Sequence, residues 1–123
     1  MIHGGSHILF SRKDIRPPQT RIMLGMGLLP VSLDHRLCPE VTLAEGPMVD
    51  VCDALDWART KLPNIRLKNP NMRPDPDRVV VVGWSSGGQL AMSTGWTAPQ
   101  RGLKPPDAIL AFYSPTDYAD TCE

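Results

Sequence analysis

The chain has 123 residues, which is enough for one modest domain and too few for two. Hydrophobic residues make up 41% of it and charged residues 21%, as in folded globular proteins and unlike disordered ones. Thirteen Lys and Arg residues balance thirteen Asp and Glu residues, so no net field favours nucleic acid or an anionic membrane. We therefore expect one domain over residues 1–123, with a small-molecule partner.

The cysteines and the N-terminal residues bear on redox state and cellular location. Cys38, Cys52 and Cys122 are odd in number and form no C-x-x-C pattern, so we expect reduced, partly buried thiols without a disulfide framework or zinc site. The first residues, MIHGGSH, do not resemble a signal peptide, and no apolar run is long enough to span a membrane. We expect a cytoplasmic protein and predict neither a metal nor another cofactor.

The N-terminal part of the chain contains a predicted helix and a predicted strand. An apolar start continues to Phe10, and a helix is expected from about Pro18 to Met26, with Gly27 beyond its end as a C-cap. The segment LLPVSL, Leu28–Leu33, is then predicted to be a short strand.

A second helix is predicted to begin at Pro47, with Gly46 as its N-cap. Thr42 and Glu45 match a capping box, but that start would place Pro47 in the second turn, where its ring clashes with preceding carbonyls. Proline is well suited to the first helical position. Apolar residues then recur at steps of three and four, which predicts an amphipathic helix packed on a sheet. They are Met48, Val51, Cys52, Leu55 and Ala58.

Strands and helices also alternate in the C-terminal half. Pro63–Pro76 has no periodicity and is rich in Pro and Asn, so we expect a surface loop. Val79–Val82 is apolar on both faces, as a buried parallel strand requires. A helix rich in small residues is expected over Ser86–Thr94 and another strand over Ala108–Tyr113. This alternation predicts an α/β fold with a parallel sheet flanked by helices.

The strongest functional signal is the segment GWSSGG, which lies between the valine strand and the following helix. G-x-S-x-G at such a junction is typical of a nucleophile elbow, a sharp turn that strains the serine backbone. Ser85 would then lie at the carboxyl end of the sheet, beside the positive end of the helix dipole. A chance Gly/Ser-rich turn is the alternative. Side chains would collide at the glycines of this turn, which are Gly83, Gly87 and Gly88.

A second signal, His3-Gly4-Gly5, precedes the elbow. Esterases use an HGG-type segment to present backbone N–H groups to the tetrahedral oxyanion, so Gly4 and Gly5 are predicted donors. The residue after the nucleophile supplies another N–H group, which assigns Ser86 to the same oxyanion hole. Without the elbow, His3 would be interpreted as an ordinary surface histidine.

The segments HGGSH, VSLDHRLCPE and GWSSGGQLAM, in this order, resemble the hormone-sensitive-lipase-type branch of the α/β-hydrolases. That branch shows HGG, D-Y-R-L-x-P-E and G-x-S-x-G-G, and the match spans residues 2 to about 118. DHRLCPEVTLAEGP and PPDAILAFYSPTDY also resemble fungal hydrolase or thioesterase-like domains, including those of polyketide synthases. The resemblance implies the central part of an α/β-hydrolase fold that cleaves carboxylic esters or thioesters by acyl transfer to Ser85.

The resemblance also implies roles for residues around these motifs. Asp34 and Arg36 would be structural, as a buried pair or as groups that bond the backbone. His35 stands where the family has Tyr, and Trp84 is expected to pack near the acyl pocket. The other two tryptophans are expected in the core: Trp57 and Trp96.

A serine hydrolase also needs a histidine base and a carboxylate that orients it, and in this fold both follow the nucleophile. No histidine follows Ser85. Asp117 is a candidate acid, although a cap of the SPTD turn is the preferred interpretation. In the family, the acid and the histidine would come from beyond Glu123, and HGG follows a full third strand. We therefore expect a core truncated at both ends and nearly inert alone.

Two alternatives to a hydrolase remain. One is a non-catalytic remnant that binds a small acyl ligand or a partner subunit through the same cleft, and the other is a module that interacts through open sheet edges. Unpaired edges offer rows of free backbone groups, so we expect the isolated chain to be marginally stable and to self-associate.

Overall fold

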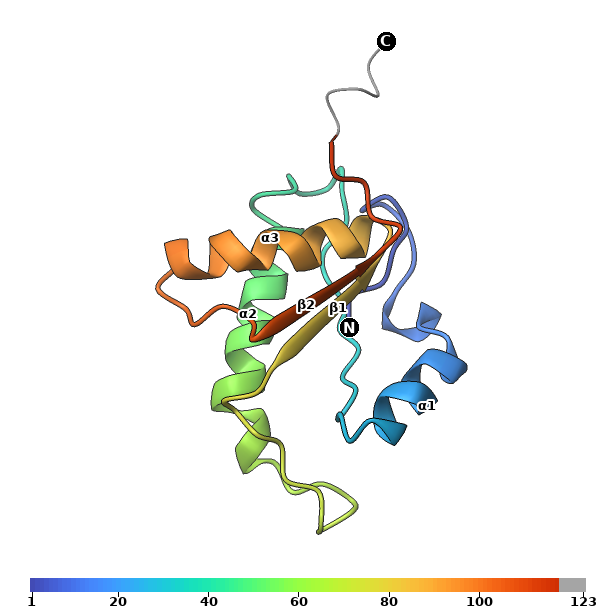
Figure 1. Ribbon diagram of the computed structural model, residues 1–123. Coiled ribbons are helices and arrows are strands. Elements are labelled where there is room, and N and C mark those ends of the chain that lie inside the picture. The colour runs from blue at the N-terminus through green and yellow to red at the C-terminus, as the bar shows by residue number, and fades with distance from the viewer. Residues whose placement is uncertain (118–123) are drawn as a thin grey trace.

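The structure is a computed structural model that describes residues 1–117. Within them, two parallel strands form a sheet: β1 (Val80–Trp84) and β2 (Ala108–Phe112). Val80 lies beside Ala108 and Trp84 beside Phe112, without a register shift. α3 (Ser86–Gln100) connects the strands and packs against both, as Figure 1 shows. This βαβ unit confirms the predicted parallel α/β architecture.

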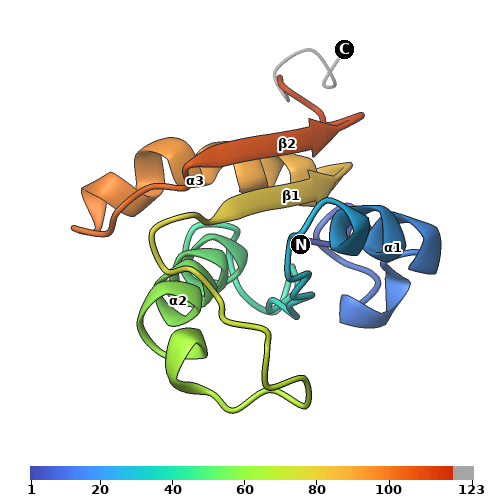
Figure 2. The same ribbon diagram turned by 60° about the horizontal axis from the view of Figure 1, so that its bottom comes forward.

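α2 (Pro47–Thr60) packs against α3 and carries the apolar face that its sequence predicts. It begins at Pro47 with Gly46 as its N-cap, as expected. α1 (Pro17–Gly25) lies across the N-terminal segment from α2 in both views (Figure 2) and buries none of its residues. The buried core therefore lies between α2, α3 and β1. Its members are Ile2, Val51, Cys52, Leu55, Val81, Leu90, Ala91 and Ala98.

Arg59, in the last turn of α2, ties that helix to the start of both strands. Its side chain is only 10% exposed and donates hydrogen bonds to the carbonyl oxygens of Pro76 and Pro105. It also pairs with Asp107 at 3.0 Å. Asp107 accepts the N–H group of Val79 at 2.8 Å, and this bond, followed by the Arg59 guanidinium, lowers the pKa of Asp107 to about 2. The amino ends of β1 and β2 are thus held by one ionic network.

Ile2 extends the sheet on the side of β1 away from β2. Its N–H group donates to the carbonyl oxygen of Val82 at 2.7 Å, and the N–H group of Trp84 donates to the Ile2 carbonyl at 3.3 Å. On its other side Ile2 forms a parallel bridge with Leu33. The Met1 ammonium donates to the carbonyl oxygen of Val31 at 2.7 Å. Ile2 is therefore an inner strand residue, bonded on both sides and fully buried.

Some predicted elements differ in extent from those observed. Leu28–Leu33 is not a strand, and within it Leu33 alone forms a bridge, because its parallel partner segment is Met1 and Ile2. α3 extends six residues beyond the predicted end at Thr94. A 3-10 helix, Leu62–Asn64, opens the predicted surface loop.

The predicted positions of two tryptophans are wrong. Trp57 is 38% exposed and Trp96 is 56% exposed, so neither belongs to the core. Each lies on a helix whose opposite face carries smaller apolar residues toward the sheet and the neighbouring helix. Of the cysteines, Cys38 and Cys52 are free thiols, half-buried and buried respectively, and Cys122 lies outside the described residues. None of the helices described is both long and apolar enough to cross a membrane.

The buried N-terminus predicts that the stability of this chain rises from pH 6 to pH 8. Burial lowers the pKa of the Met1 ammonium from 8.0 to about 6. The unfolded chain, with the ordinary pKa, binds more protons in this interval, so the free energy of unfolding falls as the pH falls from 8 to 6. The expected loss is on the order of 2 kcal/mol. Urea unfolding at a series of pH values measures it.

A chain carrying an Nα-acetyl group is the matched control for this titration. Acetylation removes the titrating ammonium while keeping an N–H donor at Met1. The pH dependence between 6.5 and 8 should then flatten. If the acetylated chain shows the same slope as the free one, the N-terminus is not its source.

Candidate active site

Ser85 is the single residue between β1 and α3. Its backbone has φ 53° and ψ −126°, a conformation that residues other than glycine rarely adopt. The strand and the helix hold it there, since its N–H group donates to the carbonyl oxygen of Phe112 at 2.9 Å and its carbonyl accepts the N–H group of Gly88 at 2.8 Å. The sequence segment that predicts an elbow thus folds into a strained strand-to-helix turn.

Glycines around Ser85 allow backbones to approach closely. A Cβ atom at Gly87 would collide with the carbonyl oxygens of Ile2 and His3, and one at Gly83 would collide with the Gly87 carbonyl. Neither glycine has a positive φ. Glycine is therefore required at these positions by the lack of space and not by the backbone conformation. The same closeness places the N-terminal segment directly against the first turn of α3.

Gly4 lies beside Ser85, and Gly5 packs against Leu9 and Phe10. A Cβ atom at Gly4 would be 3.0 Å from the carbonyl oxygen of Trp84 and 3.1 Å from the Ser85 Cβ atom. Within residues 1–117, the N–H groups of Gly4 and Gly5 have no hydrogen-bond acceptor. Ser86 is the first residue of α3, so its N–H group has no acceptor within the helix. Gly4 and Ser86 thus bring two backbone donors close to Ser85, at the positive end of the α3 dipole, and Gly5 follows Gly4 in the chain.

The three histidines are buried around the Gly4 segment. The rings of His3 and His35 stack with their centroids 4.4 Å apart and their planes at 10°. His3 Nδ1 lies 2.8 Å from the Gly4 carbonyl oxygen, and His35 Nδ1 lies 2.9 Å from that of Arg36. His3, which is 1% exposed, is therefore a buried support of the segment and not a surface residue.

His7 bonds across to α3. Its Nε2 atom lies 2.8 Å from Gln89 Oε1, and its backbone N–H group donates to the Ser86 hydroxyl at 3.4 Å. Burial lowers the pKa of both His7 and His35, which favours neutral rings. Within residues 1–117, no hydrogen bond joins a histidine to the Ser85 hydroxyl. These histidines position the loop.

Asp34 and Arg36 do not pair with each other and are not buried. Asp34 accepts the backbone N–H group of Arg12 at 2.7 Å and pairs with its guanidinium at 2.6 Å. Arg36 pairs with Asp50 on α2 at 2.8 Å and donates to the carbonyl oxygen of Glu45 at 3.0 Å. The expected alternatives were a buried Asp34–Arg36 pair and hydrogen bonds from these side chains to the backbone. The structure shows the second, at Arg12 for Asp34 and at Glu45 for Arg36. The two residues attach the chain around His35 to two different segments.

The remaining candidate residues add little to the site. Trp84 is buried and stacks on Phe112, with ring centroids 5.7 Å apart, at the carboxyl ends of the strands. Asp117 follows β2 at the end of the described residues, and its role as an acid stays a prediction. Among residues 1–117, no group of three or more His, Cys, Asp or Glu side chains is placed to hold a metal ion.

Sequence reasoning missed the contacts that hold the site together. The stacking of His3 on His35 and the bond from His7 to Gln89 join residues that are 32 and 82 positions apart. No local pattern marks such pairs. The one sequence signal for the stacking of His3 on His35 is that His35 replaces the tyrosine of the family motif.

The chain is similar to a family model, to fungal polyketide synthases and to a solved esterase structure. A sequence model described as the alpha/beta hydrolase fold matches residues 1–123. The non-reducing polyketide synthase trt4 of Aspergillus terreus is 65% identical over 120 residues, which cover 98% of this chain and 5% of that protein. The 5-methylorsellinic acid synthase of the same species is 64% identical over 118 residues, or 96% of this chain and 5% of the synthase.

A solved structure, titled Bacterial Heroin Esterase, also resembles the chain. It superposes with a TM-score of 0.79 and 27% identity, over 94% of this chain and 34% of its own. The chain thus spans a third of that esterase and a twentieth of the synthases.

The contact at Gly87 predicts a costly substitution. Gly87→Ala should lower the free energy of unfolding by at least about 2 kcal/mol, because the added methyl group meets two backbone carbonyls that cannot move independently. Gly95→Ala, in the same helix, is the matched control, since its Cβ atom would meet nothing closer than 3.6 Å. That variant should be neutral or up to about 1 kcal/mol more stable. Urea unfolding compares them, and equal midpoints would contradict the packing argument.

The strain at Ser85 predicts an unusual order of stability. The free energy of unfolding of Ser85→Gly should exceed that of Ser85→Ala by about 1 kcal/mol, because glycine adopts the observed conformation without strain. In urea unfolding, the glycine variant should therefore have the higher midpoint. At an unstrained position the order is reversed, since glycine gives the unfolded chain more freedom. A more stable alanine variant would show that Ser85 is not strained.

Proposed function

Because the chain belongs to the α/β-hydrolase fold family, we propose that it is the nucleophile-bearing core of a serine hydrolase acting on carboxylic esters or thioesters. The observation that carries this proposal is the backbone of Ser85, held at φ 53° between β1 and α3 with Gly4 against it, whose N–H group has no acceptor among residues 1–117. A turn of this kind costs stability, and a binding surface has no need of it.

The proposed reaction begins with attack of the Ser85 hydroxyl oxygen on the acyl carbonyl carbon. The carbonyl oxygen gains negative charge in the tetrahedral intermediate, where the N–H groups of Gly4, Gly5 and Ser86 stabilise it. Collapse breaks the bond to the leaving alcohol or thiol, which takes the proton that the Ser85 hydroxyl gives up, and leaves an acyl ester on Ser85. Water then attacks this ester and releases the acid, which restores the hydroxyl group. One such N–H donor is worth about a hundredfold or more in rate.

The base for this reaction is the part that the described residues do not supply. His3, His7 and His35 precede Ser85 and are bonded to other groups. We propose that the working enzyme uses a histidine and a carboxylate from elsewhere in a longer polypeptide, with Asp117 as a less favoured acid. Loss of the triad in serine enzymes costs on the order of a millionfold in turnover. Residues 1–123 alone are therefore expected to be almost inactive.

Polyketide synthases among the relatives favour a thioester over a simple ester as the substrate of the whole protein. Such a substrate presents a sulfur leaving group and a bulky acyl chain to Ser85. The esterase title of the structural neighbour favours an ester instead. Both substrate classes share the acyl transfer to serine, so the chemistry proposed for Ser85 is the same for each.

A non-catalytic acyl-binding remnant is the second candidate, favoured by the absence of a described hydrogen bond between Ser85 and a histidine. The two candidates differ in the reactivity of Ser85. An elbow serine among free N–H donors should react slowly with a fluorophosphonate even without its base, whereas a serine in a binding remnant should not.

The purified chain should hydrolyse p-nitrophenyl butyrate at no more than about a thousandfold above the uncatalysed rate, since oxyanion donors alone give catalysis of this order. Fluorophosphonate labelling over hours should modify Ser85, and Ser85→Ala should abolish the labelling. Ser86→Ala is the matched control, because it keeps the backbone N–H group that the proposal uses. Full esterase turnover would contradict the missing base, and no labelling of folded protein would contradict the nucleophile.

A further inference from the structure

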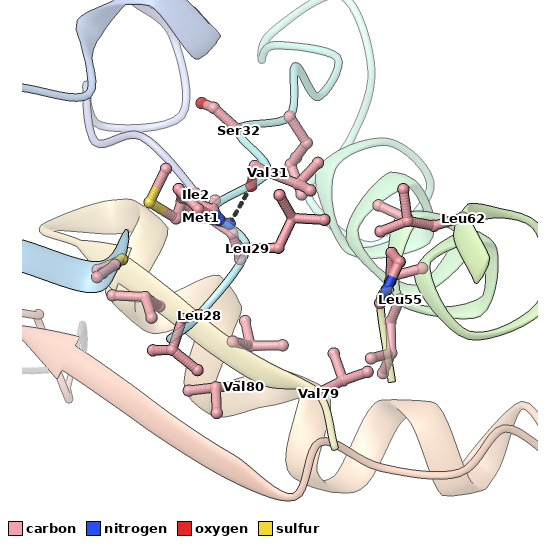
Figure 3. Close-up of a pocket in the computed structure, with 18 of the residues that line it drawn as sticks. Met1, Ile2, Leu28, Leu29, Val31, Ser32, Leu55, Leu62, Val79 and Val80 are labelled. Carbon is pink, nitrogen blue, oxygen red and sulfur yellow. Dashed lines mark hydrogen bonds between the residues drawn. The ribbon is translucent and has the colours of Figure 1, made fainter. Parts of the chain in front are cut away.

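His3 and His35 follow two segments that pair with each other. Ile2 forms a parallel bridge with Leu33, and Figure 3 shows Ile2 beside the segment that leads to Leu33, next to a hollow of about 870 Å³. Neither histidine lines that hollow. His3 follows Ile2 directly and His35 lies two residues beyond Leu33, so the bridge brings the two rings together. They stack with their centroids 4.4 Å apart.

Both rings carry a proton on Nδ1. His3 Nδ1 lies 2.8 Å from the carbonyl oxygen of Gly4, and His35 Nδ1 lies 2.9 Å from that of Arg36. A carbonyl oxygen accepts a hydrogen bond and cannot donate one, so each Nδ1 is the donor. In a neutral ring, Nε2 then has a bare lone pair and no proton.

The Nε2 atoms of these two rings are enclosed by the described part of the chain. Both are buried, and neither has a hydrogen-bond partner among residues 1–117. Protonation would place an N–H donor and a positive charge there, and both are costly in a buried position without an acceptor. The carboxylate of Asp34 interacts with the charge of His3, but Asp34 is exposed and paired with Arg12. The enclosed stack therefore favours neutral rings.

The charged groups around His35 act in both directions. A positive charge on His3 or His7 opposes protonation of His35, and the carboxylate of Asp50 on α2 favours it. Asp50 is already paired with Arg36 at 2.8 Å. Burial is the largest effect, so the pKa of His35 is lowered from its ordinary value of 6.5.

The segment after Gly4 depends on support from its neighbours. Ser6 has φ 53° and His7 has φ 63°, in the left-handed region that residues other than glycine rarely adopt. Such a backbone persists only where the surrounding structure holds it. The stacked imidazole rings hold this segment on one side, and the bond from His7 to α3 holds it on the other. If the stack opens, the segment can relax and Gly4 can leave its place against Ser85.

We propose that His35 is a positioning residue of the Ser85 site, which holds Gly4 in place through His3 only while the stacked rings are neutral. Acid opens the stack, because a ring exposed to water binds a proton more readily than the buried ring does. The support is fully present above pH 6.5, the ordinary pKa of histidine, and is lost as the pH falls below that value. The consequence for the reactivity of Ser85 rests on the proposed function, whereas the opening of the stack does not.

Proton–nitrogen correlation spectra of the imidazole rings in the 123-residue chain test the pair directly. The chain is Nα-acetylated, so that the Met1 ammonium does not titrate in the same interval. At pH 7.5, both His3 and His35 should be neutral rings with the proton on Nδ1. As the pH falls from 7.5 to 5, the backbone amide signal of Gly4 should shift with the same midpoint as the His35 ring, below 6.5.

Fluorophosphonate labelling of Ser85 tests the consequence for the site. The measure is the ratio of the labelling rate at pH 7.5 to the rate at pH 5.5, with circular dichroism to confirm that folded chains are compared. His35→Tyr is the matched variant, because it keeps an aromatic ring against His3, restores the residue of the family motif and does not titrate in this interval. The ratio should be at least about tenfold larger for the parent chain, since the loss of one oxyanion donor costs this much or more in rate.

Several results would overturn the proposal. They are a proton on Nε2 of either stacked ring at pH 7.5, a His35 ring that stays neutral down to pH 5, a Gly4 signal that follows the His7 ring instead, and equal labelling ratios for the parent chain and His35→Tyr. Should that variant fail to fold, His35→Phe takes its place. A Ser85 that reacts at no pH would contradict the proposed function, and the ring spectra would still decide the role of His35.

Discussion

The contact between the N-terminal backbone and the first turn of α3 is the constraint on which the rest of the structure depends. Gly87 faces the carbonyls of Ile2 and His3 with no room for a side chain, so α3 and the N-terminal segment are fixed with their backbones in contact. Gly4 is placed against Ser85 by the same approach. The proposed oxyanion donor Gly4 and the proposed nucleophile Ser85 therefore come from chain segments some eighty residues apart, and their close approach depends on the absence of a Cβ atom at Gly87.

The site thus combines a strained residue with rigid supports. Ser85 is held by bonds to β2 and to α3, while the segment of Gly4 rests on the stacked rings of His3 and His35. Arg59 and Asp107 hold the other ends of the same strands. Such support from several elements is what allows a disfavoured backbone conformation to persist in a folded protein. It also keeps backbone donor groups fixed in place, as the proposed acyl transfer to Ser85 requires.

Features with a local cause could be predicted from the sequence, and those that depend on distant partners could not. Gly46 and Pro47 determine the start of α2 through short-range sterics, and the motif around Ser85 determines the turn in the same way. Resemblance to the hormone-sensitive-lipase-type hydrolases and to fungal polyketide synthases is confirmed by the comparisons. Leu28–Leu33 has the composition of a strand, but a strand forms only where its backbone pairs with a neighbouring segment. In this segment only Leu33 forms a bridge, with Ile2. The ion pairs of Arg36 and Arg59 likewise leave no trace in local patterns.

The two-sided pairing of Ile2 has a consequence for the order in which the chain acquires its structure during synthesis. Ile2 is synthesised before its partners Val82 and Trp84, which follow eighty residues later. Closing so long a loop carries an entropic cost that few contacts offset before β1 is present. Until β1 has been synthesised, the apolar face of α2 has no sheet to pack against. In a nascent chain of this topology these contacts wait until the segment around Ser85 has left the exit tunnel, so the strained turn at Ser85 and the pairing of Ile2 form together.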